Sequence, residues 1–275
     1  MRNEYFDIHS HILPGVDDGS KSMEMSMQMI DAAYAQGVRK MIATPHFYPG
    51  HHNAEKERLE DLYREMVVRI SETYNDFTLL LGNEIYYKDE VIELLRKGQI
   101  FTLAGTRYIL IEFSVTVDFR CLYDAVYRCV NAGFIPVIAH VERYQCLFGK
   151  EEKIAELIGA GAYIQVNAEN FEAGLINPAR KRAMKLIHRG FVHLLGSDCH
   201  NMQDRKPDLG PAAEYIQKKM PGEICEKILR DNPQQLLQDQ YIDIFFKTIR
   251  NIRIIVRYSI LAIRFHIERC FIRRI

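Results

Sequence analysis

DIHSHILPGVDDG, residues 7–19, places two histidines at the end of a short β-rich run, with one residue between them. Because successive side chains of a strand point to opposite faces, His9 and His11 share a face and can chelate one metal ion. Two adjacent acids follow in the next loop, where Asp18 competes with Asp17 as a further ligand. Either acid could instead cap the helix that begins just after them. The stretch therefore predicts a metal site at the end of the first strand.

The same arrangement recurs along the chain, where β-rich runs alternate with helical patterns. We predict strands near residues 4–9, 39–44, 77–84, 107–113, 135–140, 162–167 and 191–197. We predict helices near residues 21–36, 53–74, 88–97, 118–132, 150–160, 177–189, 208–219, 221–230 and 233–239. Glycines suited to helix C-termini separate helix from strand at Gly37, Gly98, Gly133, Gly161 and Gly190.

Seven βα units without a long linker predict one α/β domain that forms a closed or nearly closed parallel barrel. A doubly wound open sheet is the structural alternative. No Gly-rich phosphate-binding loop follows the first strand, which weakens that alternative.

Six further metal-capable side chains fall at or just after the ends of other predicted strands: His46, Glu84, Glu112, His140, Asp198 and His200. Barrels of this kind build their active sites at the C-terminal ends of the strands, so all nine side chains should converge. Buried carboxylates such as Glu84 and Glu112 need a cationic partner, which an arginine or a metal ion would supply. His51, His52, His188, His193 and His266 lack this placement, and we interpret them as surface or packing residues.

Five histidines and four carboxylates form a mixed ligand set that suits divalent Mn, Fe, Co or Zn. Nine ligands exceed what one or two tetrahedral sites need. Three divalent ions would also leave a positive charge that attracts phosphate. Arg143 and Arg205 lie in loops at the same face and can make forked contacts to phosphate, although each could pair with a neighbouring acid, Glu142 or Asp204. The pattern predicts a polynuclear metal hydrolase.

The composition limits the class of function. The formal net charge is zero, but residues 242–275 hold eight Lys and Arg against two acids, a net of +6, which leaves −6 for residues 1–241. An acidic body argues against nucleic-acid binding. The six cysteines form no CxxC pair, no apolar leader precedes the first strand, and no uncharged stretch approaches the roughly 18 residues of a membrane span. We expect a cytoplasmic protein with reduced thiols.

Six segments together resemble the PHP (polymerase and histidinol phosphatase) superfamily, and most closely its bacterial metal-dependent tyrosine phosphatases of capsule and exopolysaccharide synthesis. They are DIHSHILPGVDDG (7–19), ATPH (43–46), GNEIYY (82–87), YILIEF (108–113), PVIAHVER (136–143) and SDCHN (197–201). The resemblance covers roughly residues 4–240. It implies a distorted (β/α)7 barrel followed by C-terminal helices, and three divalent metal ions, often manganese.

The resemblance also implies three sites, of which the first two share Glu84: His9, His11, Glu84 and Asp198 in one; Glu84, Glu112 and His140 in a second; Asp18, His46 and His200 in the third. It implies four catalytic residues, of which the two arginines bind the phosphate: Arg143, Arg205, Asp18 and His200. The implied reaction is attack of a metal-bound hydroxide on phosphotyrosine, without a protein nucleophile. The tyrosine leaving group has a pKa near 10 and needs little protonation.

The implied substrate is a phosphotyrosine protein, a membrane-associated bacterial tyrosine kinase that regulates capsule synthesis. Within the same superfamily, the alternative is a small-molecule phosphatase such as histidinol-phosphatase. A non-catalytic scaffold of polysaccharide assembly is an alternative from another class. Cys199 and Arg205 have the Cys-x5-Arg spacing of cysteine-dependent phosphatases, but no glycine lies between them to wrap the backbone around a phosphate.

Residues 242–275 depart from the resemblance, and we interpret them as a basic amphipathic helical tail after a catalytic domain of residues 1–241. Their arginines recur at helical spacing, at Arg250, Arg253, Arg257 and Arg264. Such a helix is typical of a membrane-surface or partner-binding element. The tail therefore predicts peripheral contact with anionic lipid at the inner face of the membrane. Packing on the barrel or an oligomer contact is the alternative.

Overall fold

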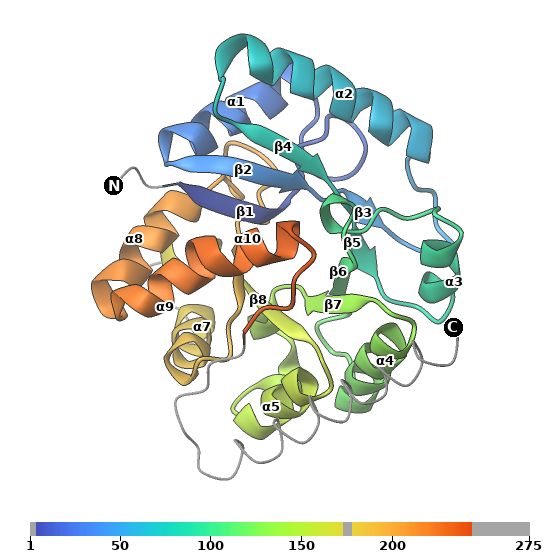
Figure 1. Cartoon of the computed structure of the whole chain (residues 1–275), viewed down its shortest axis with the longest axis vertical. Helices are drawn as coiled ribbons and strands as arrows, with labels where there is room; N and C mark the ends of the chain where they lie inside the picture. Colours follow the sequence, from blue (N-terminus) through green and yellow to red (C-terminus); the bar gives the residue numbers. More distant parts are fainter. Residues whose placement is uncertain (1–3, 173–177, 244–275) are drawn as a thin grey trace, which may run out of the picture.

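The protein is described by a computed structural model that covers residues 4–172 and 178–243, shown in Figure 1. Its strands are β1 (Tyr5–Ser10), β2 (Val38–Ala43), β3 (His46–Phe47), β4 (Thr78–Leu81), β5 (Glu84–Tyr86), β6 (Tyr108–Glu112), β7 (Ile135–Ile138), β8 (Tyr163–Asn167) and β9 (Leu194–Gly196). Every strand pairing is parallel.

The helices are α1 (Met23–Ala35), α2 (Lys56–Thr73), α3 (Val91–Arg96), α4 (Phe119–Asn131), α5 (Glu151–Gly159), α6 (Glu169–Glu172), α7 (Pro178–Arg189), α8 (Leu209–Lys219), α9 (Gly222–Glu226) and α10 (Asn232–Leu237). Short turns of other helix types are η1 (Leu103–Gly105), η2 (Val141–Arg143), η3 (Gln145–Leu147) and η4 (Lys227–Asp231). The helices surround the strands (Figure 1). Within the described ranges, no helix is long and apolar enough to cross a membrane.

The strands form two sheets, β1-β2-β4 and β3-β5-β6-β7-β8-β9, which curl into a nearly closed ring. The two sheets are continuous, because β3 follows β2 after two residues and β5 follows β4 after two residues. On the other side, Asp198 donates to the His9 carbonyl and His11 donates to the Cys199 carbonyl, both at 2.8 Å. These bonds join the first strand to the chain after the last one. The expected α/β barrel is therefore confirmed, and the open doubly wound sheet is wrong.

The predicted strand 77–84 is in fact two strands, β4 and β5. Between them, the Asn83 side chain donates to the Pro45 carbonyl at 2.8 Å and accepts from the Phe101 amide at 2.9 Å. This amide side chain bonds main-chain groups that lie beside the break in the strand. The small size of Gly82 also matters, because an added Cβ would lie 3.0 Å from Leu103. Two short elements, β3 and α6, were not predicted.

Inward-facing residues of the strands form an apolar floor beneath the predicted metal centre. Leu110 lies two residues before Glu112 on β6 and therefore shares its face. Leu110 packs in one cluster with Ile8, Ile42 and Val137, and Leu236 of α10 belongs to the same cluster. The larger cluster packs helices against strands. The site is thus placed above a rigid apolar layer.

A register shift between Asp7 and Ser10 interrupts the pairing of β1 with β2. Such a bulge redirects side chains and is common beside active sites. It allows Ile8 to join the apolar floor while the next residue, His9, lies among the predicted ligands.

His193, interpreted above as a packing residue, is buried just before β9. Its Nδ1 accepts the Ile164 amide at 3.0 Å, and its ring packs edge-on against Tyr163. Burial lowers the pKa of His193 to about 3, whereas an unfolded histidine titrates near 6.5. Between pH 3 and pH 6.5 the unfolded chain therefore binds more protons than the folded chain. The contribution of neutral His193 to stability is fully present above pH 6.5 and is lost as the pH falls toward 3.

The variant His193→Asn keeps an acceptor for Ile164 but removes the titrating ring. Between pH 7 and pH 5 the free energy of unfolding of wild type should therefore fall by about 2 kcal/mol more than that of the variant. Urea unfolding of both proteins at the two pH values measures this difference. If the free energy of unfolding fell equally in the two proteins, His193 would not be the group whose lowered pKa causes the loss of stability.

Candidate metal centre

All nine sequence-predicted ligands meet at one end of the barrel, within β1, β3, β5 and β6 or in the segments that follow β1, β7 and β9. Eight of them fall into three overlapping groups whose ligand atoms lie within 4.8 Å of one another: His11, Asp18, His46 and His200; His9, His11, Glu84 and Asp198; His46, Glu84 and Glu112. The ninth, His140, places Nε2 2.9 Å from Glu84 Oε1 and 3.6 Å from Glu112 Oε2. The geometry therefore brings the whole predicted set together, and ion binding by it stays a prediction.

Glu84, the first residue of β5, is the centre of the arrangement. Its Oε2 lies 3.3 Å from Nε2 of both His9 and His11 and 3.1 Å from His46 Nδ1, while Oε1 contacts His140. The carboxylate is only 1% exposed. Burial opposes its ionisation, but the surrounding histidines hold the pKa of Glu84 well below its usual range. The lowered pKa favours the ionised carboxylate, whose two oxygens face histidines of different groups.

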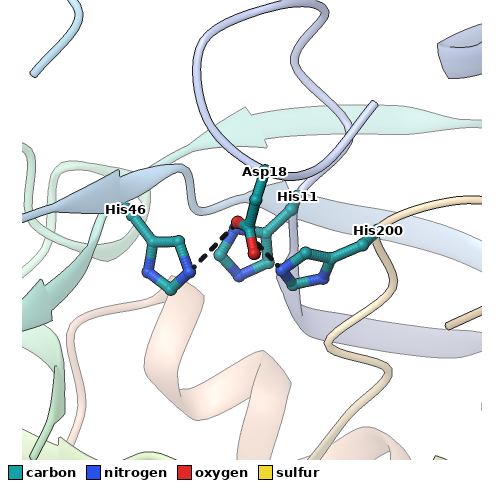
Figure 2. Close-up of side chains that lie close together, drawn as sticks. All are labelled: His11, Asp18, His46 and His200. Carbon is teal, nitrogen blue, oxygen red and sulfur yellow. Dashed lines mark ion pairs between the residues drawn. The ribbon is translucent and has the colours of Figure 1, made fainter. Parts of the chain in front are cut away.

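Asp18 comes from the loop after β1 and points between two histidines (Figure 2). Its Oδ1 lies 3.4 Å from His46 Nε2 and 3.3 Å from His200 Nε2. Contacts with His200 and His46 lower the pKa of Asp18, although partial burial opposes this shift. Asp18 thus faces the group that also contains His11.

Asp17, the competing acid, has a different contact. Its Oδ2 lies 2.8 Å from His11 Nδ1 and accepts the His46 amide at 3.1 Å. Asp17 therefore orients the His11 ring through Nδ1, while the other ring nitrogen, Nε2, faces the predicted ligands. Neither acid caps α1, because Ser22 does so by accepting from Met25. Only glycine fits at position 19 of this turn, because an added Cβ would lie 2.2 Å from the His11 carbonyl oxygen.

The donor set fits metal ions because several buried atoms in it have no hydrogen-bond partner. Within the described residues these include His46 Nδ1, Glu112 Oε1 and Asp198 Oδ1. Buried polar atoms normally have partners, and here the lone pairs lie beside one another in the same cluster. Divalent ions would satisfy them together.

Two predicted ligands have an unusual backbone. His140 and Asp198 both have positive φ values, 33° and 55°. Left-handed backbone is costly for residues other than glycine and is concentrated at functional sites. The strain follows from turning the chain sharply after β7 and β9 while both side chains stay directed at Glu84 and its neighbours.

The two arginines predicted to bind phosphate converge on one ligand. Asp198 Oδ2 lies 3.3 Å from Arg143 Nη1 and 2.6 Å from Arg205 Nη2. Arg143 also pairs with Glu169 at 2.5 Å, and Arg205 Nη1 lies 2.8 Å from His200 Nε2. Neither arginine makes an ion pair with the neighbouring acid considered from the sequence. Both guanidinium groups therefore border the predicted metal groups.

Cys199 is completely buried, and burial raises the pKa of its thiol well above the ordinary value. A nucleophilic cysteine needs exposure and a lowered pKa, so this residue is a packing residue. The Cys-x5-Arg spacing is therefore fortuitous.

Supporting residues on β8 were missed by the sequence reasoning. Gln165 Oε1 accepts the His140 amide at 2.7 Å and lies 3.4 Å from His9 Nδ1. Asn167 Nδ2 donates to Asp198 Oδ2 at 2.7 Å. Gln165 and Asn167 are two polar residues on one face of a buried strand, and this pattern could have identified them from the sequence.

The chain is similar to known proteins in sequence and in structure. The sequence model of a family described as capsular polysaccharide synthesis, CpsB/CapC, matches residues 5–238. Tyrosine-protein phosphatase CpsB of Streptococcus pneumoniae is 35% identical over 241 residues, covering 86% of this chain and 99% of the relative. Tyrosine-protein phosphatase YwqE of Bacillus subtilis is 32% identical over 237 residues, covering 86% and 92%.

A solved structure from work on YwqE of Bacillus subtilis and CpsB of Streptococcus pneumoniae, described as unique metal-dependent tyrosine phosphatases, has a TM-score of 0.80 and 31% identity. It covers 86% of this chain and 96% of that one. Histidinol phosphate phosphatase of Lactococcus lactis has a TM-score of 0.53 and 14% identity, covering 79% and 93%. At that identity the likeness concerns the fold alone.

Proposed function

The chain belongs to the CpsB/CapC family of capsular polysaccharide synthesis proteins, and from this premise we propose that it is a metal-dependent tyrosine-protein phosphatase. The observation that carries the proposal is the convergence of nine nitrogen and oxygen ligands at one end of the barrel, with two arginines beside them. This arrangement supplies cation sites and phosphate-binding groups within one centre.

We propose that three divalent ions occupy the three overlapping groups, with His140 completing the group of Glu84 and Glu112. Manganese is the metal we propose, and iron, cobalt and zinc suit the same donors. Bound divalent ions supply Lewis acidity, which lowers the pKa of water and neutralises charge on phosphoryl oxygens. Relative to the sites implied by resemblance, the geometry adds His11 to the group of Asp18 and His46 to the group of Glu112.

The side chains of this chain hold and orient the substrate. Arg143 and Arg205 are each about 30% exposed, so they can contact a phosphate that enters from solvent. Arg205 Nε is buried and has no hydrogen-bond partner in the described residues. Glu169 holds the Arg143 guanidinium in place through its 2.5 Å contact. The tyrosine leaves with little need for protonation because its pKa is near 10.

The deciding experiment compares hydrolysis of a phosphotyrosine peptide with hydrolysis of histidinol phosphate, with and without added Mn²⁺, by wild type and His140→Ala. We expect metal-dependent turnover that favours the peptide and is lost in the variant. A preference for histidinol phosphate would place the chain among small-molecule phosphatases. Absence of turnover on both would favour a scaffold, and metal-independent activity abolished by Cys199→Ser would overturn the metal chemistry.

We further propose that the substrate is a membrane-associated tyrosine kinase and that the enzyme acts in the cytoplasm near the inner membrane face. The basic tail 242–275 supports this placement by its net charge of +6. Residues 244–275 lie outside the described residues, so the amphipathic helix stays a prediction. A chain that ends at Tyr241 is expected to sediment less with anionic vesicles than the full chain. Equal sedimentation would remove the lipid contact.

A further inference from the structure

Two tyrosines follow the predicted ligands on neighbouring strands. β3 and β5 pair in parallel with His46 opposite Glu84 and Phe47 opposite Ile85. Continued by one residue, this register sets Tyr48 opposite Tyr86. Because residues i and i+2 of a strand share a face, Tyr48 lies on the side of His46 and Tyr86 on the side of Glu84. Two residues of strand rise by roughly 7 Å, so the backbone of both tyrosines lies one layer beyond His46 and Glu84.

The ring contacts agree with this register. The Tyr48 ring centroid lies 5.0 Å from that of His46 and 5.4 Å from that of Tyr86, with 33° between the two tyrosine planes. His51 packs edge-on against Tyr48 at 6.2 Å. Tyr48 and Tyr86 are both only partly buried, so the pair presents aromatic surface beside the site. We refer to Tyr48 and Tyr86 as the aromatic wall.

The loop that carries Tyr48 is held in place by side chains. Asn53 accepts the Tyr48 amide at 2.7 Å and donates to the carbonyls of Tyr48 and His51, each at 3.0 Å. Lys88, two residues after Tyr86, donates to the Pro49 carbonyl at 2.8 Å and so ties the two strand ends together. The wall is therefore preorganised.

The next residue, Tyr87, has a packing role and provides a contrast with Tyr48 and Tyr86. Tyr87 points to the other face of β5, where its ring packs against Phe113 at 5.6 Å. Phe113 in turn packs against the buried Tyr144. The Tyr48 ring instead packs against the predicted ligand His46, the Tyr86 ring packs against Tyr48, and both tyrosines are partly exposed.

We infer that the aromatic wall binds the phenyl ring of the substrate and thereby selects aryl phosphates over alkyl phosphates. The inference rests on the proposed phosphatase function. A phosphate held at the metal groups and the arginines extends its ester group outward, into the layer that Tyr48 and Tyr86 occupy. Offset or edge-to-face packing then stabilises an aryl group by about 0.5–1.5 kcal/mol beyond simple burial, and an alkyl group lacks this contribution.

The test measures the ratio of kcat/KM for phenyl phosphate to kcat/KM for propyl phosphate. The intrinsic reactivity of the two esters cancels when variants are compared with wild type. Tyr48→Leu and Tyr86→Leu should each lower the ratio by about threefold to tenfold. Tyr48→Phe should keep it, because the ring and not the hydroxyl makes the contact. Tyr127→Leu, which replaces a tyrosine that is 59% exposed on α4, is the matched control.

Inhibition supplies a second readout that does not depend on turnover. In the leucine variants, the inhibition constant of phenylphosphonate should rise by the same factor, and that of methylphosphonate should stay within about twofold of wild type. If the leucine variants kept the wild-type ratio and the wild-type affinity for phenylphosphonate, the aromatic wall would not bind the substrate ring. The proposed phosphatase function would be unaffected by that result. A wild type that hydrolyses no monoester would overturn the proposed function, and direct binding of phenylphosphonate to the variants would still decide the inference.

Discussion

Replacing Glu84 with glutamine is expected to lower phosphatase activity by about a thousandfold or more, the scale of losing a central electrostatic contact in a buried site. Glu84 contacts His9, His11, His46 and His140 from its two oxygens. Glutamine keeps the shape, but one of its two ends becomes an NH2 donor that cannot bind a cation. The variant should therefore also hold fewer metal ions per chain, which elemental analysis of the purified protein measures.

Glu142→Gln is the matched control for this variant. Glu142 is equally buried and lies two residues from a predicted ligand, but its Oε1 accepts the amide of Asn167 and the side chain of Asn170. Burial raises the pKa of Glu142, so a neutral side chain is tolerated there better than at Glu84. We expect this control to keep its metal content. A Glu84→Gln protein with full metal content and wild-type turnover would show that Glu84 is not a bridging ligand.

Much of this centre follows from local sequence rules. Each βα unit can be recognised in the sequence by a β-rich run, a helical pattern and a glycine. Gly37, Gly133 and Gly161 adopt the positive φ expected at a helix C-terminus. Because parallel strands end at one face of a barrel, residues at successive strand ends must converge. That rule placed His9, Glu84 and their partners together without any knowledge of contacts.

The remaining features depend on contacts between distant segments. β3 has only two residues and exists because it pairs with β5, 38 positions later, so no periodicity reveals it. Asp17 and Asp18 are adjacent and chemically identical, and only the fold of their loop decides that Asp18 faces the cluster while Asp17 holds His11. Likewise, the ion pair of Arg143 with Glu169 spans 26 positions, so the sequence offered only the adjacent Glu142 as an alternative partner.

Exchange of the arginines for lysine tests a different part of the same centre. Arg205→Lys and Arg143→Lys are each expected to lower kcat/KM for a phosphotyrosine peptide by about a hundredfold, the scale of losing one preorganised donor in a transition state. Lysine keeps the positive charge beside Asp198 but presents a point charge in place of a planar fork, so the two-point contact to phosphate is lost. Steady-state kinetics with the peptide and inhibition by inorganic phosphate measure this loss.

The metal content separates this effect from that of Glu84→Gln. Both arginines contact Asp198 through Oδ2, whereas its Oδ1 lies 3.4 Å from the ring nitrogens of His9 and His11. A lysine at either position should therefore weaken phosphate binding and leave the bound metal unchanged. If the lysine variants lost metal in proportion to activity, the arginines would act by holding Asp198 in its strained conformation. If they kept both metal and activity, the phosphate would bind elsewhere in the centre.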